Sequence, residues 1–161
     1  MATAYSKIQR NFWETDEARE MTPEEKYFWM YLQTNANVNT LGCYAFRMRK
    51  AMDETGYNRE TLEKLLQRME QVLRILYDEG TKEVFLLHWA EGNWNKKTAT
   101  LRALAADLKE IQSKTLKETV KTLLLKNGIF TEEEVEKAEK TAPSAQERNE
   151  KEQRGTTGNK R

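Results

Sequence analysis

The chain has 161 residues, of which 38% are apolar and 33% are charged, and its formal net charge is +1. This length and composition suit one small, mostly helical domain with polar appendages rather than a large apolar core. The single cysteine, Cys43, excludes an internal disulfide and a cysteine-built zinc site, and the single histidine, His88, argues against a histidine metal site or a Ser-His-Asp triad.

The first strong signal in chain order is a helix start at residues 22–25, Thr-Pro-Glu-Glu. The threonine can cap the helix, the proline fits the first helical position, and the second glutamate can complete a capping box. The run Tyr27 to Leu32 is nearly all apolar, so this helix is expected to be buried on more than one side and to end near Thr34. Before it, Phe12-Trp13 is expected to be an apolar anchor.

Residues 42–87 are expected to form a helix-turn-helix followed by a β-hairpin. In winged-helix DNA-binding domains, which share this order, the second helix of the pair lies in the major groove. The expected elements are a strand at Gly42–Tyr44, a helix at Phe46–Thr55, a turn at Gly56, a helix at Asn58–Gln71, a strand at Val72–Tyr77, a turn at Asp78–Lys82 and a strand at Glu83–Leu87.

The helix at Asn58–Gln71 has two faces. Its apolar residues recur at helical spacing and are expected to face the core: Leu62, Leu65, Leu66, Met69 and Leu73. Its polar face suits contact with DNA, although Glu60, Glu63 and Glu70 lie on or near it and weaken that interpretation. The alternative is a solvated face on which oppositely charged residues pair at i,i+4 spacing.

The candidate DNA-binding residues lie on and just before this helix. Phosphate contacts are expected from basic side chains before it, and groove contacts to base edges or phosphates from its polar face. These candidates are Arg47, Arg49 and Lys50, followed by Asn58, Arg59, Lys64, Gln67 and Arg68. Lys82 is the one basic residue at the tip of the expected wing, beside Asp78, Glu79 and Glu83, so the wing is predicted to be structural or to contact protein.

Beyond the hairpin, residues 98–111 and 113–125 are helical by composition, and a capping box at residues 131–134 opens a short acidic helix. The basic residues of the two helices at 98–125 could bind phosphates or form a solvated face. The apolar stripe of these helices is expected to pack in part against a second copy or a replication partner. The expected division is a winged-helix domain at 1–92, a basic helical extension at 93–128, the acidic helix at 129–142 and a disordered polar tail at 143–161.

Aromatic residues invite a base-stacking role, but core packing is favoured. Trp13, Trp29, Trp89 and Trp94 each sit beside apolar or strand-like residues. His88 is expected to be a packed strand residue and Cys43 a small core residue. No phosphate-binding glycine loop and no catalytic carboxylate pair is recognisable, so an enzyme is the least favoured class.

Several segments together resemble the N-terminal domain of phage and prophage replisome organisers, which are related to DnaD-type primosomal proteins of low-GC Gram-positive bacteria. The resemblance covers roughly residues 7–125. The segments that carry it are Asn11-Phe12-Trp13, Thr22 to Lys26, Tyr31 to Asn35, Asn39 to Tyr44, Thr55-Gly56-Tyr57, Ile75 to Asp78 and Asn93 to Lys96. The aromatic motif of the second domain of such proteins is not recognised here.

The resemblance implies a winged-helix protein that binds origin DNA and helps recruit the helicase-loading machinery. No cofactor is expected, because the helix-turn-helix order points to DNA contact and no phosphate-binding loop is recognisable. The expected fold class is mainly α with a small β-hairpin, a winged helix-turn-helix followed by C-terminal helices. Double-stranded DNA is the expected partner, with a helicase loader, other replication proteins or a second copy as further candidates. No membrane role is expected, and the expected location is the cytoplasm of a bacterial host cell. A winged-helix protein-interaction module and a transcriptional regulator remain the alternatives.

Overall fold

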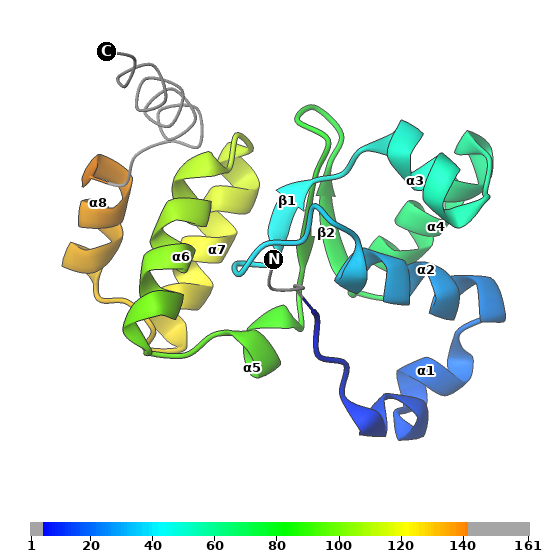
Figure 1. The fold of residues 1–161 in the computed structure, drawn as a ribbon, viewed down its shortest axis with the longest axis horizontal. Helices are drawn as coiled ribbons and strands as arrows, with labels where there is room; N and C mark the ends of the chain where they lie inside the picture. The colour runs from blue at the N-terminus through cyan, green and yellow to red at the C-terminus, as the bar shows by residue number, and fades with distance from the viewer. Residues whose placement is uncertain (1–4, 142–161) are drawn as a thin grey trace, which may run out of the picture. The chain divides into compact units, whose positions relative to one another are not determined.

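The structure, a computed structural model, describes residues 5–141 (Figure 1). Contacts divide the chain into two compact units, Met1–Trp94 and Asn95–Arg161, and each is described by itself. The tail at 143–161, expected to be disordered, lies outside the described residues. Among the helices that the structure describes, none has the length and apolar character needed to cross a membrane.

The first unit opens with two short helical segments that the sequence did not predict, η1 (Arg10–Glu14) and α1 (Asp16–Glu20). Thr15 separates them: its backbone N–H donates to Phe12 O (3.2 Å), and its side-chain oxygen accepts from Ala18 N (3.2 Å). Each segment is about one turn long, which is too short to show helical periodicity in the sequence.

The capping box predicted for the next helix, α2 (Pro23–Thr34), is confirmed. Thr22 Oγ1 accepts from Glu25 N (3.2 Å), and the Glu25 carboxylate accepts from Thr22 N (2.9 Å). The helix ends at Thr34, as expected. Phe28 and Leu32 are fully buried and anchor the helix in the core.

A small antiparallel sheet of three strands completes the framework, with the order β1-β3-β2. Val84, in the middle strand, lies opposite Tyr44 of the first strand and Tyr77 of the second. The described chain is therefore mainly helical with a small sheet, as the sequence predicted in outline. The strands are β1 (Cys43–Ala45), β2 (Ile75–Asp78) and β3 (Glu83–Leu86).

Two helices, α3 (Met48–Thr55) and α4 (Arg59–Gln71), follow β1 and are joined by a tight turn at Gly56. Gly56 has φ 81°, a left-handed conformation that favours glycine. The predicted helix start at Phe46 is wrong. Phe46 N donates to Lys82 O (2.8 Å), which continues the sheet beyond β1 and delays the helix by two residues.

The end of α4 also differs from the prediction. Leu73 was placed in the buried stripe, but it has φ 55° and its side chain is 68% exposed. Arg74 N donates to Met69 O (2.9 Å), a bond that reverses the chain directly after the helix. The expected strand start at Val72 is wrong for the same reason, because this reversal places the first strand residue at Ile75.

After β3 the chain enters a short helix that the sequence did not predict, α5 (Trp89–Asn93). The indole of Trp89 donates to Thr40 O (3.0 Å), and that of Trp94 donates to Leu41 O (3.1 Å). A Cβ on Gly42 would lie 2.4 Å from the Trp89 ring, so only glycine fits there. Through these contacts α5 and the residue after it pack against the loop before β1.

Two aromatic predictions for this unit are wrong. Trp13 is 62% exposed and lies near the Lys26 ammonium, 5.8 Å from its ring centroid, instead of packing in the core. His88 is an exposed residue just before α5 instead of a packed strand residue. Trp29, Trp89 and Cys43 are buried as expected.

The second unit contains α6 (Thr98–Glu110), α7 (Lys114–Lys126) and α8 (Glu132–Thr141), close to their predicted positions. The α6–α7 stripe is mostly buried, including Leu104 and Val120, with Val135 of α8 also buried. Lys121 of α7 pairs with Glu139 of α8 (2.9 Å), so the acidic helix neutralises one residue of the basic face. The Glu139 hydrogen bond is the main reason that the pKa of Lys121 is raised.

Candidate nucleic-acid interface

Helix α4 presents an exposed polar face and buries the opposite one. Leu62, Leu65, Leu66 and Met69 are buried, as predicted, and α4 packs on α2, α3 and β2. Asn58 caps the helix, because its Oδ1 accepts from Thr61 N (2.8 Å). The cap engages the Asn58 side chain, so this predicted contact residue fixes the start of the helix.

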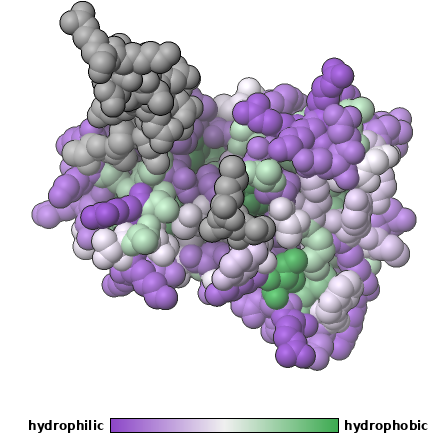
Figure 2. All heavy atoms as spheres, in the orientation of Figure 1, coloured by the Kyte–Doolittle hydropathy of each residue, from purple (hydrophilic) through white to green (hydrophobic). Residues whose placement is uncertain are grey.

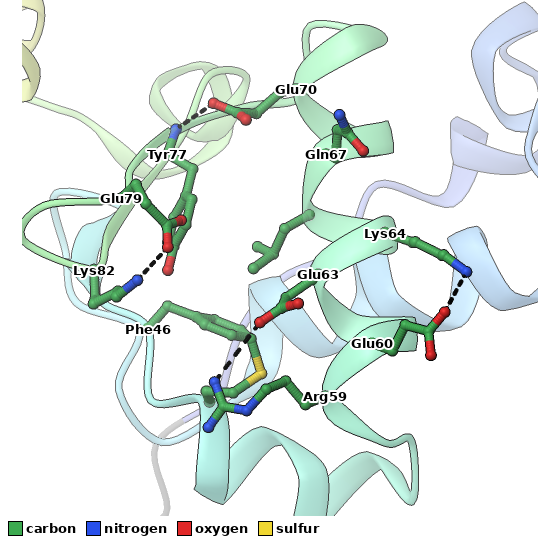
Figure 3. A pocket seen from close by; sticks show the side chains of 12 residues that line it. Phe46, Arg59, Glu60, Glu63, Lys64, Gln67, Glu70, Tyr77, Glu79 and Lys82 are labelled. Carbon is green, nitrogen blue, oxygen red and sulfur yellow. Dashed lines mark hydrogen bonds and ion pairs between the residues drawn. The ribbon is translucent and has the colours of Figure 1, made fainter.

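A groove of about 540 Å³ lies between the exposed face of α4 and the β2–β3 hairpin (Figure 3). Phe46, Leu66 and Tyr77 line its apolar part. The charged lining is mixed, with four carboxylates against three basic side chains. These residues are Glu60, Glu63, Glu70 and Glu79, with Arg59, Lys64 and Lys82.

Each of the three basic residues in the groove forms an ion pair with a glutamate three or four residues away in sequence. Lys64 donates to Glu60 at 2.7 Å, and Arg59 lies 3.7 Å from Glu63. The Lys64 hydrogen bond lowers the pKa of Glu60. Lys82 pairs with Glu79 in the same way within the hairpin. The i,i+4 pairing considered as the alternative for α4 is therefore present, and DNA phosphates would compete with these carboxylates.

Arg68, another predicted contact residue, joins two helices. Its Nε donates to Glu25 Oε1 at 2.9 Å, and the Glu25 side chain is only 10% exposed. The same carboxylate completes the capping box of α2. No local pattern connects residues 25 and 68, so sequence reasoning missed this structural role. Arg68 is half exposed, and its first function is to hold α4 against the start of α2.

The remaining predicted residues gather around α3 and the middle of α4. Arg47 and Arg49 are exposed and form no ion pair with any residue the structure describes. Gln67 is exposed on α4. The two arginines flank Met48, which lines the groove, but they lie beside the groove rather than in it. Lys50 lies 3.6 Å from Glu54, one turn further along α3.

The hairpin is attached to α4 by its backbone. Tyr77 N donates to Glu70 Oε1 (3.0 Å), so Glu70 is a structural link that the sequence did not reveal. Burial, followed by the charge of Glu79, raises the pKa of Tyr77 to about 12. At the hairpin tip Asp78 Oδ1 accepts from Gly80 N (2.8 Å) and Thr81 N (3.1 Å). The hairpin thus has a fixed position beside α4.

The surface around these elements is mostly polar. Hydrophilic side chains cover much of the face drawn in Figure 2, with smaller apolar areas between them. No group of three or more histidine, cysteine or acidic residues suited to a metal ion occurs within residues 5–141. In comparisons with known proteins, no family model, no curated protein and no solved structure matches this chain.

Proposed function

We propose that the protein is a winged-helix protein that binds duplex DNA through α4 and the start of α3. The element order α2-β1-α3-α4-β2-β3 and the sheet order β1-β3-β2 support this proposal, because a winged helix has the same arrangement. In this interpretation α4 is the recognition helix and enters the major groove, while the hairpin is the wing.

One observation carries the proposal: two arginines at the start of α3, the helix before α4, are exposed and have no ion-pair partner among the described residues. Arginine donors bind phosphate oxygens strongly, and such contacts fix the register of a protein on a duplex. Arg47 and Arg49 would hold the phosphate backbone. Lys64 and Gln67, both exposed on α4, would then reach base edges or further phosphates.

The biological setting follows from the resemblance to phage and prophage replisome organisers. The protein would bind origin DNA in a bacterial host cell and help recruit the helicase-loading machinery. Its contribution would be positioning, with no cofactor and no catalytic step. A transcriptional regulator with the same domain would contact DNA through the same residues.

A salt titration of duplex binding tests the proposal. Fluorescence anisotropy of labelled duplex, single-stranded and phage-origin DNA would be measured from about 50 to 200 mM salt, because released counterions make phosphate contacts salt-dependent. We expect the duplex to bind without nucleotide or metal and to lose affinity steeply as salt rises. Absence of duplex binding at the lowest salt would contradict the proposal.

The charge of the groove favours a second candidate, a protein-interaction module. Four carboxylates line the groove against three basic residues, and two of those basic residues already pair on α4. A groove of this kind fits a partner segment that carries lysine or arginine, by charge complementarity. Binding of a basic peptide in the groove, together with no duplex binding at low salt, would favour this function.

A further inference from the structure

A second concave site in the first unit shares no lining residue with the groove beside α4. It encloses about 520 Å³ between the N-terminal segment, α2 and the β3–α5 junction. Phe12, Trp29 and Trp89 form apolar parts of its wall, and the amide side chains of Gln33 and Asn93 also line it. Its volume is in the range of ligand sites. Most of the other lining residues are polar or charged, among them Lys7, Glu17, Arg74, His88 and Glu91, so the pocket suits a polar ligand.

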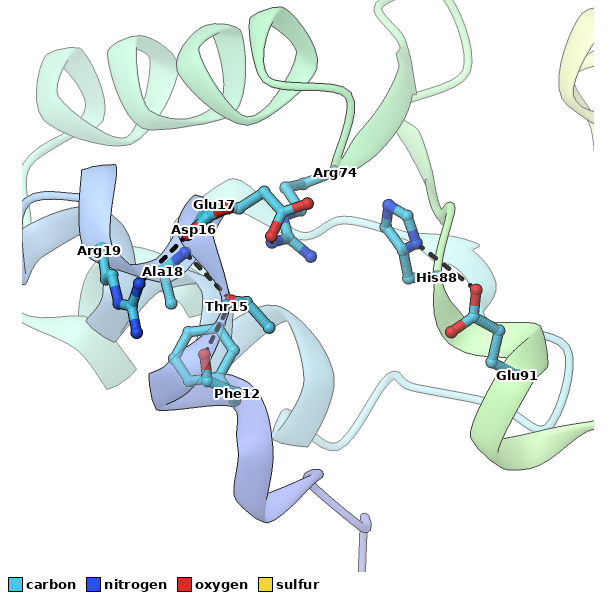
Figure 4. Close-up of polar contacts among 9 residues, drawn as sticks. All are labelled: Phe12, Thr15, Asp16, Glu17, Ala18, Arg19, Arg74, His88 and Glu91. Carbon is cyan, nitrogen blue, oxygen red and sulfur yellow. Dashed lines mark hydrogen bonds and ion pairs between the residues drawn. The ribbon is translucent and has the colours of Figure 1, made fainter.

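The unusual group in this pocket is Arg74. Its side chain is 10% exposed, and its buried Nε has no hydrogen-bond partner. Among the described residues, its one charged neighbour is Glu17, whose Oε2 lies 3.7 Å from Nη2 (Figure 4). That separation is too long for a hydrogen bond, so the Arg74 guanidinium has no close acceptor among the described residues, and its Nε is buried without a partner.

The backbone and an aromatic ring fix the position of this guanidinium. Arg74 N donates to Met69 O (2.9 Å), and Arg74 O accepts from Leu87 N (3.0 Å). The guanidinium carbon lies 5.5 Å from the centroid of the Trp29 ring, within the range of a cation–π contact. Arg74 is therefore positioned before any ligand arrives, which reduces the entropy lost on binding.

We propose that this pocket binds a carboxylate of an acidic segment of a partner protein. Leaving a charge buried without a partner is costly, and a carboxylate matches the planar fork of arginine with two parallel hydrogen bonds. Lys7 and His88 line the pocket as well as Glu17 and Glu91, so the lining carries both signs of charge. A singly charged carboxylate is favoured over a phosphate dianion, because the two glutamates repel a second negative charge more strongly. The walls at Phe12 and Trp29 suit an apolar residue beside the acidic one.

Glu17 acts as the internal competitor for this site. It is 60% exposed on the short helix α1, and its long contact with Arg74 is readily exchanged for a closer one. The ligand carboxylate would displace Glu17 and pair with the Arg74 guanidinium. This contact is independent of the DNA surface on α3 and α4, because no proposed DNA-binding residue lines the pocket.

An NMR titration of the full chain tests the inference, with the Arg74 Nε–Hε resonance as the reporter. The probes are the peptide amide N-acetyl-Leu-Glu-Leu-NH2, its neutral counterpart with Gln in place of Glu, the Gln peptide with a free C-terminal carboxylate, and inorganic phosphate. We expect the Glu peptide to shift the resonance saturably and to bind about tenfold or more tightly than the neutral peptide. The free-carboxylate peptide shows whether a chain end serves as well as a side chain.

Three variants separate a binding role from a structural one. Arg74→Lys keeps the positive charge but lacks the planar guanidinium, so binding of the Glu peptide should be lost. In this variant binding is followed by the backbone amide signals of residues around the pocket. Glu17→Gln removes the competitor and should tighten binding severalfold. Glu20→Gln, an exposed charge on α1 outside the pocket, is the matched control and should leave binding unchanged.

The outcomes are distinct. Saturable binding of the Glu peptide that is tightened by Glu17→Gln and lost in Arg74→Lys supports the site. The proposal is overturned if neither carboxylate peptide gives a saturable shift, or if the neutral peptide binds as tightly as the Glu peptide. Binding of phosphate alone would also overturn it and would identify the pocket as a phosphate site. Duplex binding measured on Arg74→Lys should be unchanged, which distinguishes failure here from failure of the DNA proposal.

Discussion

The basic residues of α4 and those at the start of α3 differ in what surrounds them. Arg59 and Lys64 on α4 each face a glutamate one turn away, and Arg68 holds the buried Glu25. Arg47 and Arg49 are also exposed but have no ion-pair partner in the described chain. A count of basic residues does not distinguish the two groups. They differ in whether each side chain already forms an ion pair.

This difference determines where phosphate affinity should come from. A phosphate that contacts Lys64 must compete with Glu60 for its ammonium group and lies near another carboxylate. Repulsion from these carboxylates offsets part of the favourable free energy of the contact. A phosphate that meets Arg47 or Arg49 has no such competitor. We therefore expect the start of α3 to supply most of the affinity, and α4 to contribute orientation and groove contacts.

The largest expected effect is on DNA affinity. The double variant Arg47→Gln/Arg49→Gln should weaken duplex binding roughly a hundredfold, at about tenfold for each charge-assisted contact. The slope of log affinity against log salt should fall by roughly 1 for each arginine. Anisotropy titration at several salt concentrations measures both quantities.

The matched control is Arg10→Gln/Arg19→Gln, which removes the same charge from exposed positions in η1 and α1. It should change affinity far less than the α3 variant. Equal losses in the two double variants would mean that only the net charge matters, and the contrast between α3 and the rest of the unit would then be wrong.

The next effect concerns stability. Arg68→Ala should lower the free energy of unfolding by about 1–3 kcal/mol, because it removes a donor from the mostly buried Glu25 carboxylate. Lys64→Ala on the same face loses only an exposed pair and should cost under about 1 kcal/mol. Urea denaturation followed by circular dichroism gives both values. Equal stability of the two variants would show that the Arg68–Glu25 pair contributes no more to stability than the exposed Lys64–Glu60 pair.

A smaller effect is expected from the carboxylates that compete with DNA. Glu60→Gln should release Lys64 and raise duplex affinity by about two- to fivefold, within the energy of an exposed ion pair. Glu14→Gln, an exposed charge distant in sequence from α4, is the control. If the groove instead binds a basic protein segment, Glu60→Gln should leave DNA binding unchanged and weaken that peptide.

The smallest effect is a pH dependence at the hairpin. The pKa of Tyr77 is raised to about 12 by burial and by the nearby Glu79 charge, so the folded state holds the phenolic proton more tightly than the unfolded chain. This contribution to stability is fully present below about pH 10 and is lost as pH rises toward 12. The thermal midpoint of Tyr77→Phe should fall less between these pH values than that of the parent. If the thermal midpoints of the variant and the parent fall by the same amount, Tyr77 does not contribute to the pH dependence of stability.

Local chemistry explains which parts of the fold could be predicted. The caps at Thr22 and Asn58 and the capping box at Thr131 depend on residues within one turn, and all three are present. The buried stripe of α4 follows from helical spacing. Leu73 breaks that spacing because a chain reversal, which periodicity does not encode, turns it to solvent.

The parts that could not be predicted depend on residues far apart in sequence. Glu25 meets Arg68 only when α2 packs on α4, and Arg74 is buried only when the N-terminal segment covers it. Trp13 looked like a core residue by type, yet it lies over Lys26 at the surface. For the candidate site, the sequence placed the basic residues on the correct elements but could not show which of them are already paired.

The central claim is that duplex DNA contacts the start of α3 and the polar face of α4. A ¹H–¹⁵N spectrum of the full chain, recorded with and without a short duplex at low salt, tests it most directly. We predict that the side-chain Nε–Hε signals of Arg47 and Arg49 and the exposed backbone amides near Lys64 and Gln67 shift together as duplex is added. Shifts confined to the second unit or to the Arg74 pocket, or no shifts at all, would contradict the claim.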